Sequence, residues 1–461
     1  MSAEPASSTS RGSATTDTIF ALSSAKGRAG VCVFRVSGPL ARMAVTELTR
    51  KALPAIRQAS RRDVFEPDGT IIDNGLVLWF QAPASFTGED VAEFQLHGGP
   101  AIIEAMVQRL AVVKGLRPAD PGEFTRQAFA NGKLDLTEAE GLADLIAAET
   151  AQQRRLALRQ MQGGLKELYE TWRGDLIRAG AYLEATIDFA DEDIPDTLIA
   201  DVQARVTSLA NAIRTHLADG RRGQIVRDGF TIVILGEPNV GKSSLLNALA
   251  RRDVAIVSPT PGTTRDSIEV NLDLAGYAVT LIDTAGLRDT RDEIESEGIR
   301  RARAKAQHAD LRLAVVEYSG DGVDSRVSKE LSAHDLILIN KSDLATRPPT
   351  FSAASAHRHL AVSAKTGIGM DELVRYLEQE VVARAGGSQS MPITRIRHRQ
   401  ALEQALASLD RCVNGFSIQS LQFDLLAEDI RLAARALGRV TGRVDVEDLL
   451  DVIFRDFCIG K

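Results

Sequence analysis

Residues 236–243 read Gly-Glu-Pro-Asn-Val-Gly-Lys-Ser and match the phosphate-binding pattern G-x-x-x-x-G-K-[ST] at every fixed position. In this pattern the backbone N–H groups of the loop surround a polyphosphate, and the following helix N-terminus adds partial positive charge. Lys242 would neutralise the β- and γ-phosphate oxygens, and the Ser243 hydroxyl would ligate Mg²⁺. The other loop residues expected at the nucleotide are Asn239, Val240, Gly241 and Ser244.

A second motif continues this chemistry further along the chain. Asp283, Thr284, Ala285 and Gly286 form a D-T-A-G run directly after an apolar segment. Asp283 would hold Mg²⁺ through a water molecule, and the Gly286 N–H would meet the γ-phosphate. All four residues are expected to contact the nucleotide.

Asn340, Lys341 and Asp343 belong to an N-K-x-D motif that can select the base. A carboxylate at Asp343 accepts hydrogen bonds from both N1–H and the 2-amino group of guanine. Adenine offers neither donor, so a buried Asp343 would be left without partners by ATP. Sites of that kind exclude the wrong ligand by about 10⁴-fold.

A fourth motif, Ser363, Ala364 and Lys365, follows the next apolar run and can present a backbone N–H to guanine O6. A single N-K-x-D sequence is often a solvated turn. Four motifs in this order, each after an apolar run, predict that the nucleotide is GTP.

Leu287 follows Gly286, where many GTPases carry a glutamine that orients the attacking water. A leucine cannot do this, so catalytic help must come from elsewhere. Asn239 could ligate a monovalent cation where an arginine finger would otherwise lie, and Glu295 could orient water through a second water. Taken alone, Glu295 is equally compatible with a solvated carboxylate at a helix start. We predict K⁺-dependent hydrolysis, and slower hydrolysis with little loss of nucleotide affinity in Glu295→Ala.

The elements that position these motifs can be read from the apolar runs. The short β-prone runs are residues 230–235, 279–282, 311–316, 336–339 and 360–362. A helix-like run at residues 244–249 follows the phosphate loop. Alternation of strands and helices predicts a doubly wound α/β P-loop G domain with a parallel sheet over residues 223–385.

The segments on either side have a different character. Residues 17–134 read as an α+β domain, with strand-like runs at 31–36, 75–80 and 91–96 and a helix from Ile102. No proline interrupts residues 122–194, where Ala, Leu, Glu and Arg dominate. Thr137 and Glu140 have capping-box spacing, and Gly163 with Gly164 is expected to separate two helices. The tail, residues 393–457, has the same helical character.

Helices before and after the G domain cannot bury their apolar faces alone, so we predict one discontinuous all-α domain built from both segments. The chain is therefore multidomain. The expected divisions are a disordered extension at 1–16, the α+β domain at 17–134, the first helical segment at 135–222, the G domain at 223–385 and the second helical segment at 386–461.

Composition limits the possible roles. The chain has 461 residues and a net charge of −7, so it is not a nonspecific nucleic-acid binder, and RNA contacts must come from local basic patches. Its three cysteines form no metal-ligand or disulfide pattern, which indicates a reducing, cytoplasmic location. No apolar run approaches the roughly 18 residues of a membrane span.

Five further motifs are more specific than the phosphate loop: residues 86–90 (FTGED), 121–125 (PGEFT), 131–136 (NGKLDL), 261–266 (PGTTRD) and 457–461 (FCIGK). Together they resemble the tRNA modification GTPases of the MnmE (TrmE) family, from about residue 17 to the C-terminus. The resemblance implies an N-terminal tetrahydrofolate-binding domain that forms a homodimer, a discontinuous helical domain and an inserted G domain.

The resemblance also implies an activity. The chain would hydrolyse GTP in a K⁺-dependent cycle activated when two G domains meet. With the FAD protein MnmG, it would build an aminomethyl or carboxymethylaminomethyl group on C5 of the wobble uridine of certain tRNAs. The carbon would come from a folate one-carbon unit, 5-formyl- or methylene-tetrahydrofolate.

Residue roles follow from matching positions. The K⁺ ligands would be Asn239, Ser258, Thr260 and Thr263, and the Mg²⁺ ligands Ser243 and Thr264. Glu295 matches the catalytic glutamate, and Cys458 a cysteine needed for modification. Folate contacts would be Arg35, Glu93, Lys133 and Lys461. The chain departs from the family pattern at Pro259 and Pro261, which remove N–H donors but keep carbonyls that can bind a cation, and at residues 24–30.

Several alternatives stay open at this point. A cysteine such as Cys458 is more often a small buried residue than a nucleophile. The basic cluster of Arg395, Arg397, His398 and Arg399 fits a solvated helix face or a tRNA phosphate contact equally well. A ribosome-assembly GTPase that binds rRNA is the competing function, but no G-x-x-G loop in a basic module is visible. A folate-dependent transferase without tRNA would leave the G domain unexplained.

Overall fold

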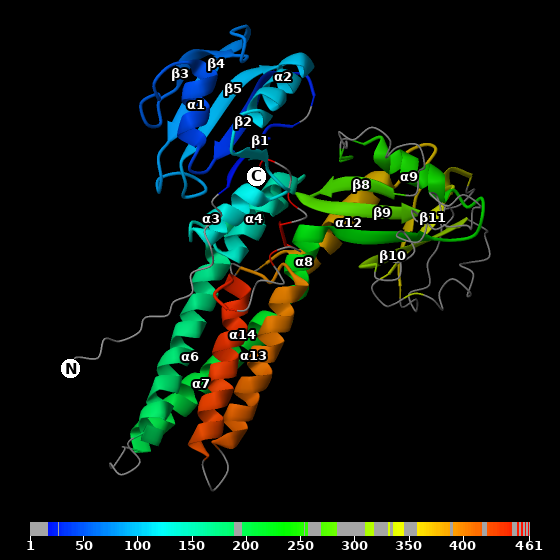
Figure 1. Ribbon diagram of the computed structural model, residues 1–461. Helices are drawn as coiled ribbons and strands as arrows, with labels where there is room; N and C mark the ends of the chain where they lie inside the picture. The colour runs from blue at the N-terminus through cyan, green and yellow to red at the C-terminus, as the bar shows by residue number, and fades with distance from the viewer. Residues whose placement is uncertain are drawn as a thin grey trace, which may run out of the picture. The chain divides into compact units, whose positions relative to one another are not determined.

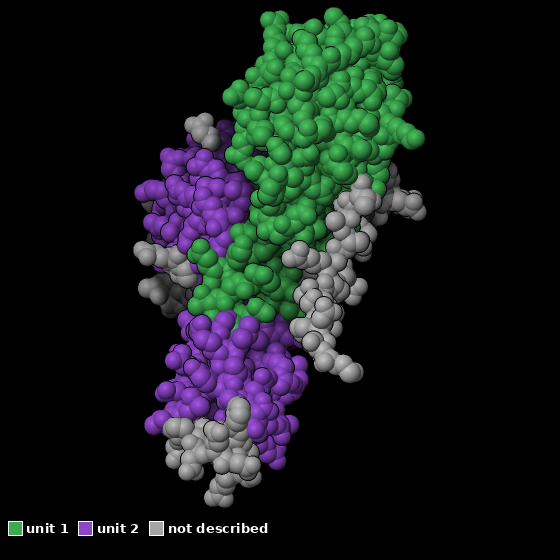
Figure 2. Space-filling view, turned by 60° about the vertical axis from the view of Figure 1, so that its left-hand side comes forward, with its two compact units in different colours: residues 1–143, 166–173, 437–461 green, residues 144–165, 174–436 purple. Residues whose placement is uncertain are grey.

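The computed structural model describes residues 17–25, 27–188, 196–252, 254–256, 269–283, 309–317, 331, 335–344, 357–387, 391–416, 422–444, 450, 453–454, 457 and 460. The predicted disordered extension, residues 1–16, lies outside this set. The chain divides into two compact units (Figure 2). Unit 1 contains residues 1–143, 166–173 and 437–461, and unit 2 contains residues 144–165 and 174–436.

Unit 1 contains a six-stranded sheet with the strand order β3-β4-β5-β2-β1-β6. Its strands are β1 (Thr18–Leu22), β2 (Ala29–Ser37), β3 (Ser60–Phe65), β4 (Ile71–Phe80), β5 (Val91–Gly98) and β6 (Leu116–Pro118). The pairs are antiparallel except β1 with β6. The three predicted strands correspond to β2, β4 and β5. The sequence analysis missed β1, β3 and β6; β6 has only three residues, and β3 reads Ser-Arg-Arg-Asp-Val-Phe, which lacks an apolar run.

Helices α1 (Ala41–Thr49) and α2 (Pro100–Ala111) cover one face of this sheet (Figure 1). Side chains alternate along β2, so that Cys32, Phe34 and Val36 are buried in this core, while Arg35 on the other face is only partly buried. The second face therefore carries the side chains that are available for ligands or partners.

Helix α3 (Glu123–Ala130) and the part of α4 (Leu136–Ala147) up to Ala143 belong to unit 1, and residues 144–147 of α4 belong to unit 2. Leu136 and Ala139 form a buried apolar cluster with Phe454 and Phe457. The predicted capping box of Thr137 and Glu140 is wrong. Asp135 caps α4 instead: its carboxylate accepts from the Glu138 N–H at 2.8 Å, and Glu138 accepts from the Asp135 N–H at 2.7 Å. The helix begins two residues earlier than the Thr137 cap required.

Unit 2 contains the greater part of the helical domain. Its helices are α5 (Ala151–Met161), α6 (Gly164–Asp188), α7 (Asp196–Ala218), α8 (Gly220–Asp228), α13 (Ile396–Gly415) and α14 (Phe423–Thr441), of which α6 and α14 extend into unit 1. Helices from before and after the G domain lie side by side (Figure 1), which confirms the discontinuous helical fold. Arg214 on α7 pairs with Asp410 on α13 at 2.8 Å, and Arg431 on α14 pairs with Glu184 on α6 at 3.0 Å. None of the helices within the described ranges is long and apolar enough to cross a membrane.

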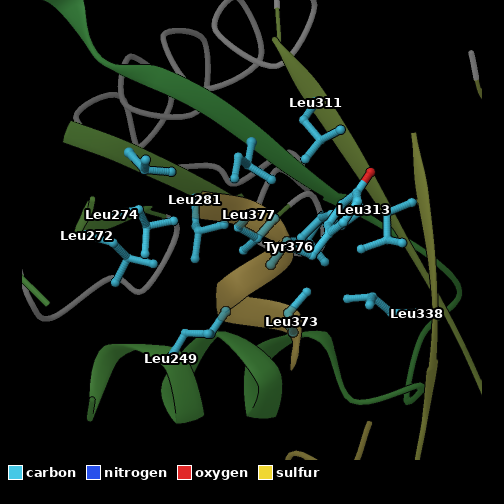
Figure 3. Close-up of a cluster of buried hydrophobic side chains, with 14 of the residues drawn as sticks. Leu249, Leu272, Leu274, Leu281, Leu311, Leu313, Leu338, Leu373, Tyr376 and Leu377 are labelled. Atoms are coloured by element: carbon cyan, nitrogen blue, oxygen red, sulfur yellow. The ribbon is translucent and has the colours of Figure 1, made fainter. Parts of the chain in front are cut away.

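The G domain contains the second six-stranded sheet, with the order β12-β11-β10-β7-β9-β8. Its strands are β7 (Phe230–Leu235), β8 (Glu269–Leu274), β9 (Tyr277–Asp283), β10 (Leu311–Glu317), β11 (Leu336–Asn340) and β12 (Arg358–Ala361). The predicted parallel sheet is confirmed, with β8 as an antiparallel edge strand. Side chains of α9 (Lys242–Ala250) and α12 (Met370–Ala385), including Leu249, Leu373 and Leu377, pack against it in one apolar core (Figure 3). Parallel strands bring the loops after β7, β9 and β11 to one edge.

Candidate functional site

The phosphate loop has a backbone that requires small residues at two places. Gly236 has φ +147°, and a Cβ atom there would lie 2.3 Å from the Val315 carbonyl oxygen. Gly241 has φ +97°, and its Cβ would lie 2.2 Å from Asn340 Nδ2. The chain between them turns through Asn239, which has φ +68°. The two glycines therefore let the loop curl against β10 and β11 with its N–H groups free to surround an anion.

Lys242 is 5% exposed at the first residue of α9. Its Nζ donates to the carbonyl oxygens of Gly236 and Glu237, both at 2.8 Å. The loop's own carbonyls thus hold the ammonium group at the edge of the loop. A phosphate oxygen can replace one of these neutral acceptors with a charged one, which makes the stronger hydrogen bond.

Ser243 and Asp283 come together from different elements. The Ser243 hydroxyl donates to Asp283 Oδ2 at 2.9 Å, and Asp283 is 2% exposed at the end of β9. Hydroxyl and carboxylate oxygens are the ligands that Mg²⁺ prefers, and this pair adjoins the phosphate loop. The donor set fits a Mg²⁺ ion at this position.

Asn340 and Asp343 organise the loops that are expected to read the base. Asn340 is 3% exposed; its Nδ2 donates to the Val240 carbonyl at 2.9 Å, and its Oδ1 accepts from the Ala364 N–H at 3.2 Å. It therefore ties three loops together. Asp343 accepts from the Ser363 hydroxyl at 2.6 Å, which orients one carboxylate oxygen.

Other predicted residues differ in where the structure places them. Ser244 and Lys365 are exposed, and Lys341 pairs with Glu317 at 2.9 Å. The remaining predicted nucleotide, metal and catalytic residues lie outside the described residues and stay predictions: Ser258, Thr260, Thr263, Thr264, Thr284, Ala285, Gly286 and Glu295. Pro259, Pro261 and Leu287 also lie outside them.

A second candidate site lies on the sheet of unit 1. Arg35 and Glu93 are direct cross-strand partners on β2 and β5, and the guanidinium donates to Glu93 Oε1 from Nε at 3.0 Å and from Nη2 at 2.8 Å. The Phe86 and Phe124 ring centroids lie 5.4 and 5.7 Å from the Arg35 guanidinium carbon. Both charged side chains keep about a fifth of their surface exposed, 20% and 17%. A fixed cation, a carboxylate and two aromatic rings suit a planar heteroaromatic ligand with polar edges.

The loop at residues 83–90 closes one side of this region. Lys133 donates to the Pro83 carbonyl at 3.0 Å, and Asn131 Nδ2 donates to the Thr87 carbonyl at 2.8 Å. Lys133 is therefore attached to the loop that carries Phe86, but no hydrogen bond or ion pair joins it to Arg35 or Glu93 in the described portion of the chain.

The sequence analysis missed two residues here whose polar side-chain atoms are buried. Glu89 Oε2 is buried without a hydrogen-bond partner, and burial raises the pKa of this carboxyl group against the opposing Asn131 hydrogen bond. Gln127 is 4% exposed, and neither atom of its amide has a partner among the described residues. Gln127 shares a face of α3 with Phe124 and Asn131. Glu89 and Gln127 lie in or beside motifs that supported the family resemblance, but single-sequence reasoning carries no signal for an unpaired buried amide.

The C-terminal end of the chain contacts the beginning of the same sheet. The Ser23 hydroxyl donates to the Gly460 carbonyl at 3.0 Å, and a Cβ at Gly460 (φ +95°) would lie 2.5 Å from the Leu22 carbonyl oxygen. Leu22 ends β1, whose Ala21 pairs with Arg35. Cys458 and Lys461 lie outside the described residues, close to Gly460 in sequence.

The basic cluster at the start of α13 has a structural role that neither alternative for it included. Arg395 Nη2 donates to Asp144 Oδ1 at 2.8 Å, His398 is fully buried, and Arg399 Nη2 donates to the Leu217 carbonyl at 3.4 Å. Arg397 is partly buried and also has a partner. These contacts hold α13 against α4 and α7, so the cluster is neither a solvated face nor a free phosphate-binding patch.

Two family descriptions match this chain. One, "MnmE helical domain", covers residues 136–458, and the other, "GTP-binding protein TrmE N-terminus", covers residues 18–133. Together they include the sheet with Arg35 and Glu93 and the whole of unit 2.

Full-length relatives carry one name. Proteins called "tRNA modification GTPase MnmE" from Paramagnetospirillum magneticum, Parvibaculum lavamentivorans and Rhodopseudomonas palustris are 53%, 52% and 49% identical to this chain. Each alignment covers 96% of this chain and 99% or more of the relative.

Proposed function

We propose a specific role in wobble-uridine modification for this chain, which belongs to the MnmE family of tRNA modification GTPases. The chain is a GTP hydrolase that acts in tRNA modification. In the proposed reaction it works in the cytoplasm with the FAD protein MnmG. The pair installs an aminomethyl or carboxymethylaminomethyl group on C5 of the wobble uridine, with the carbon supplied by a tetrahydrofolate one-carbon unit.

One observation carries this proposal beyond GTP hydrolysis. Unit 1 combines the Arg35–Glu93 pair between two aromatic rings with the chain's terminal segment at Gly460. A GTPase that only switches between GTP- and GDP-bound states does not require such a site. Phe86 and Phe124 also lie in the FTGED and PGEFT motifs, which are among those that resemble the family most specifically.

The GTP step would use residues from the loops after β7 and β11. Lys242 neutralises phosphate oxygens, Asp343 accepts from the guanine edge, and Asn340 holds the base-side loops in position. Ser243, with Thr264, would hold Mg²⁺, and Asp283 would support it; the ion neutralises charge that develops on the phosphates.

Water activation is assigned to a cation and a glutamate. Asn239, Ser258, Thr260 and Thr263 would hold K⁺, which supplies positive charge near the transferred phosphoryl group, and Glu295 would orient the attacking water through a second water. The exposure of Asn239, at a left-handed backbone position within the phosphate loop, supports the first assignment.

The folate would lie on unit 1. Arg35 and Glu93 supply a cation and a carboxylate to the polar edge of the pterin, and Phe86 and Phe124 supply apolar faces. Lys133 and Lys461 would attract the acidic tail of the folate. Cys458 would take part in the uridine chemistry, because it matches the family cysteine that is needed for modification.

The homodimer would form through the face of this sheet that α1 and α2 leave uncovered. Val31 on β2 and Leu76 on β4 are 57% and 40% exposed. Exposed apolar side chains on a sheet face favour burial against a second copy. GTP hydrolysis would then be activated when the two G domains of the dimer meet.

The decisive test is nucleoside analysis of tRNA from a deletion strain, complemented with the wild-type chain or with Arg35→Ala. We expect the C5-modified uridine to disappear on deletion and to return only with the wild type. Normal modification in the deletion strain would reject the proposed role.

A second experiment isolates the GTP step. Hydrolysis is measured in K⁺ and in Na⁺ at equal ionic strength, for the wild type and for Asn239→Ala. We expect the rate to fall sharply in Na⁺ for the wild type, with a much smaller cation effect in the variant. Equal wild-type rates in both salts would remove the cation role of Asn239.

A further inference from the structure

Helix α5 carries an arginine face that no step of the reaction above uses. The helix reads Ala-Gln-Gln-Arg-Arg-Leu-Ala-Leu-Arg-Gln-Met, with three arginines and no acidic residue. Arg154, Arg155 and Arg159 are exposed, while Ala157 and Gln160 are buried on the opposite side. Arg155 and Arg159 are four residues apart and lie on the same side of the helix, and Arg154 adjoins Arg155. We call these three exposed arginines the α5 arginine face.

Two residues of the α5 arginine face, Arg154 and Arg155, differ from several other arginines of unit 2 in their pairing. Arg227 and Arg395 both pair with Asp144, and Arg214 pairs with Asp410. The side chains of Arg154 and Arg155 make no ion pair or hydrogen bond with any residue that the structure describes. The chain as a whole has a net charge of −7, so these unpaired guanidinium groups form a local region of positive charge on an acidic protein.

We propose that the α5 arginine face binds the phosphate backbone of the tRNA substrate. The planar guanidinium forms bidentate hydrogen bonds with phosphate, and Arg155 and Arg159 are one helical turn apart, where they can contact successive phosphates of one strand. The proposal rests on tRNA being the substrate of this chain.

An acidic protein partner is the competing occupant, and the composition of the face disfavours it. Stable protein interfaces depend on a desolvated core with aromatic or other large apolar anchors. Leu158, 39% exposed, is the one large apolar side chain on the exposed side of α5. A charged surface with one apolar residue fits a phosphate backbone better.

The position of α5 connects this contact to the G domain. The Gln152 N–H donates to the Gly276 carbonyl at 3.0 Å, in the turn between β8 and β9. Gln153 Nε2 donates to the Arg227 carbonyl at 3.0 Å, near the end of α8. Strand β9 leads from that turn to Asp283, and β7, which follows α8, leads to the phosphate loop. RNA bound to α5 would therefore contact a helix that is hydrogen-bonded next to the starts of β7 and β9. These two strands lead to the candidate phosphate loop and to Asp283.

The test measures binding of an unmodified tRNA transcript with uridine at the wobble position. The full-length chain and Arg154→Gln/Arg155→Gln are compared by fluorescence anisotropy from about 50 to about 200 mM KCl. We expect the double variant to bind about tenfold more weakly, and its slope of log affinity against log salt to fall by roughly 1 to 2. Glutamine preserves the helix propensity of arginine.

A matched control removes the same charge elsewhere. Arg205 on α7 and Lys114 after α2 are exposed and have no side-chain partner among the described residues, so Arg205→Gln/Lys114→Gln changes the net charge equally. We expect wild-type affinity and slope for this control, and unchanged GTP hydrolysis without tRNA in both variants.

The outcomes separate the two proposals. If the slope of log affinity against log salt is the same in the wild type and in the α5 variant, the α5 assignment is overturned but the proposed function is not. The same conclusion follows if the α5 variant binds tRNA normally but no longer binds an acidic protein partner. Failure of the wild-type chain to bind the transcript would overturn the α5 assignment. Normal modified uridine in the deletion strain would instead overturn the proposed function, whatever the binding result.

Discussion

The chain contains two six-stranded sheets that carry their candidate ligand residues in different places. In the G domain the candidate residues lie in loops after parallel strands. In unit 1 they are side chains on the uncovered face of a largely antiparallel sheet, where Arg35 and Glu93 meet across two strands. The G-domain site is therefore encoded in short contiguous motifs, and the unit 1 site in single residues far apart in sequence.

The largest expected effect tests how completely one loop residue determines the G-domain ligand. Asp343→Asn replaces an acceptor with a donor, so it should weaken GTP binding by about 10³- to 10⁴-fold and favour xanthosine triphosphate, whose O2 can accept from the new amide. Both nucleotides are measured by calorimetry. Ser363→Ala, which removes only the hydrogen bond that orients Asp343, should cost about fivefold and keep guanine specificity.

The next prediction concerns the backbone of the same site. Gly236→Ala should destabilise the G domain by about 3 kcal/mol, because the new Cβ meets a backbone oxygen at a φ that favours glycine. Gly367→Ala also has positive φ, +84°, but no atom within 4 Å, so about 1 kcal/mol is expected. Urea denaturation followed by a probe in the G domain measures both. Equal losses would show that φ, rather than contact with Val315, makes glycine necessary.

For the unit 1 sheet the expected effect is smaller, because several side chains share the binding. Arg35→Lys keeps the charge but loses the planar fork and its stacking between Phe86 and Phe124, so 5-formyltetrahydrofolate should bind about tenfold more weakly. GTP affinity should not change. Arg61→Lys on the edge strand β3 is the control. A similar loss of folate binding there would indicate general damage to the sheet.

The smallest expected effect concerns Glu89. Burial raises the pKa of Glu89, so the folded state favours the protonated carboxyl group. Ionisation of Glu89 therefore lowers the free energy of unfolding, and this loss grows as the pH rises through the raised pKa. Glu89→Gln should therefore stabilise unit 1 by roughly 0.5 kcal/mol at neutral pH, after allowance for solvent screening, and by nothing at acid pH. Thermal melts across that range measure the difference. A variant that is less stable at neutral pH would show that the charged form is needed.

Much of the G domain could be predicted from sequence because its strands are continuous apolar runs and its loops are contiguous motifs. Strand β3 could not be predicted, because a charged residue, Arg62, occupies one of its two buried positions. The alternation of buried and exposed residues is therefore not visible as an alternation of apolar and polar residue types. The N-cap of α4 was predicted wrongly because two nearby residues could cap the helix. Thr137 had the right spacing to Glu140, but it is Asp135 that accepts hydrogen bonds, from the Thr137 hydroxyl and from the Glu138 N–H. Choosing between them requires knowing where the chain enters the helix.

The same limit applied to the candidate site. Arg395 and Arg399 looked free in sequence, but their partners, Asp144 and the Leu217 carbonyl, are far away along the chain. Arg154 and Arg155 attracted no notice in sequence because an exposed basic helix is common. Pairing across the fold, which single-sequence reasoning cannot see, separates the structural arginines from the unpaired ones.

The contact between Ser23 and Gly460 joins residues 437 positions apart. During synthesis β1 and β2 are made before the G domain, but other residues of unit 1, including Phe454 and Phe457, are made after it. Unit 1 therefore cannot finish folding until these residues have been made, while the intervening G domain can. Closing so long a loop slows folding. A chain shortened before Gly460 would lack the contact between this residue and Ser23, which follows β1.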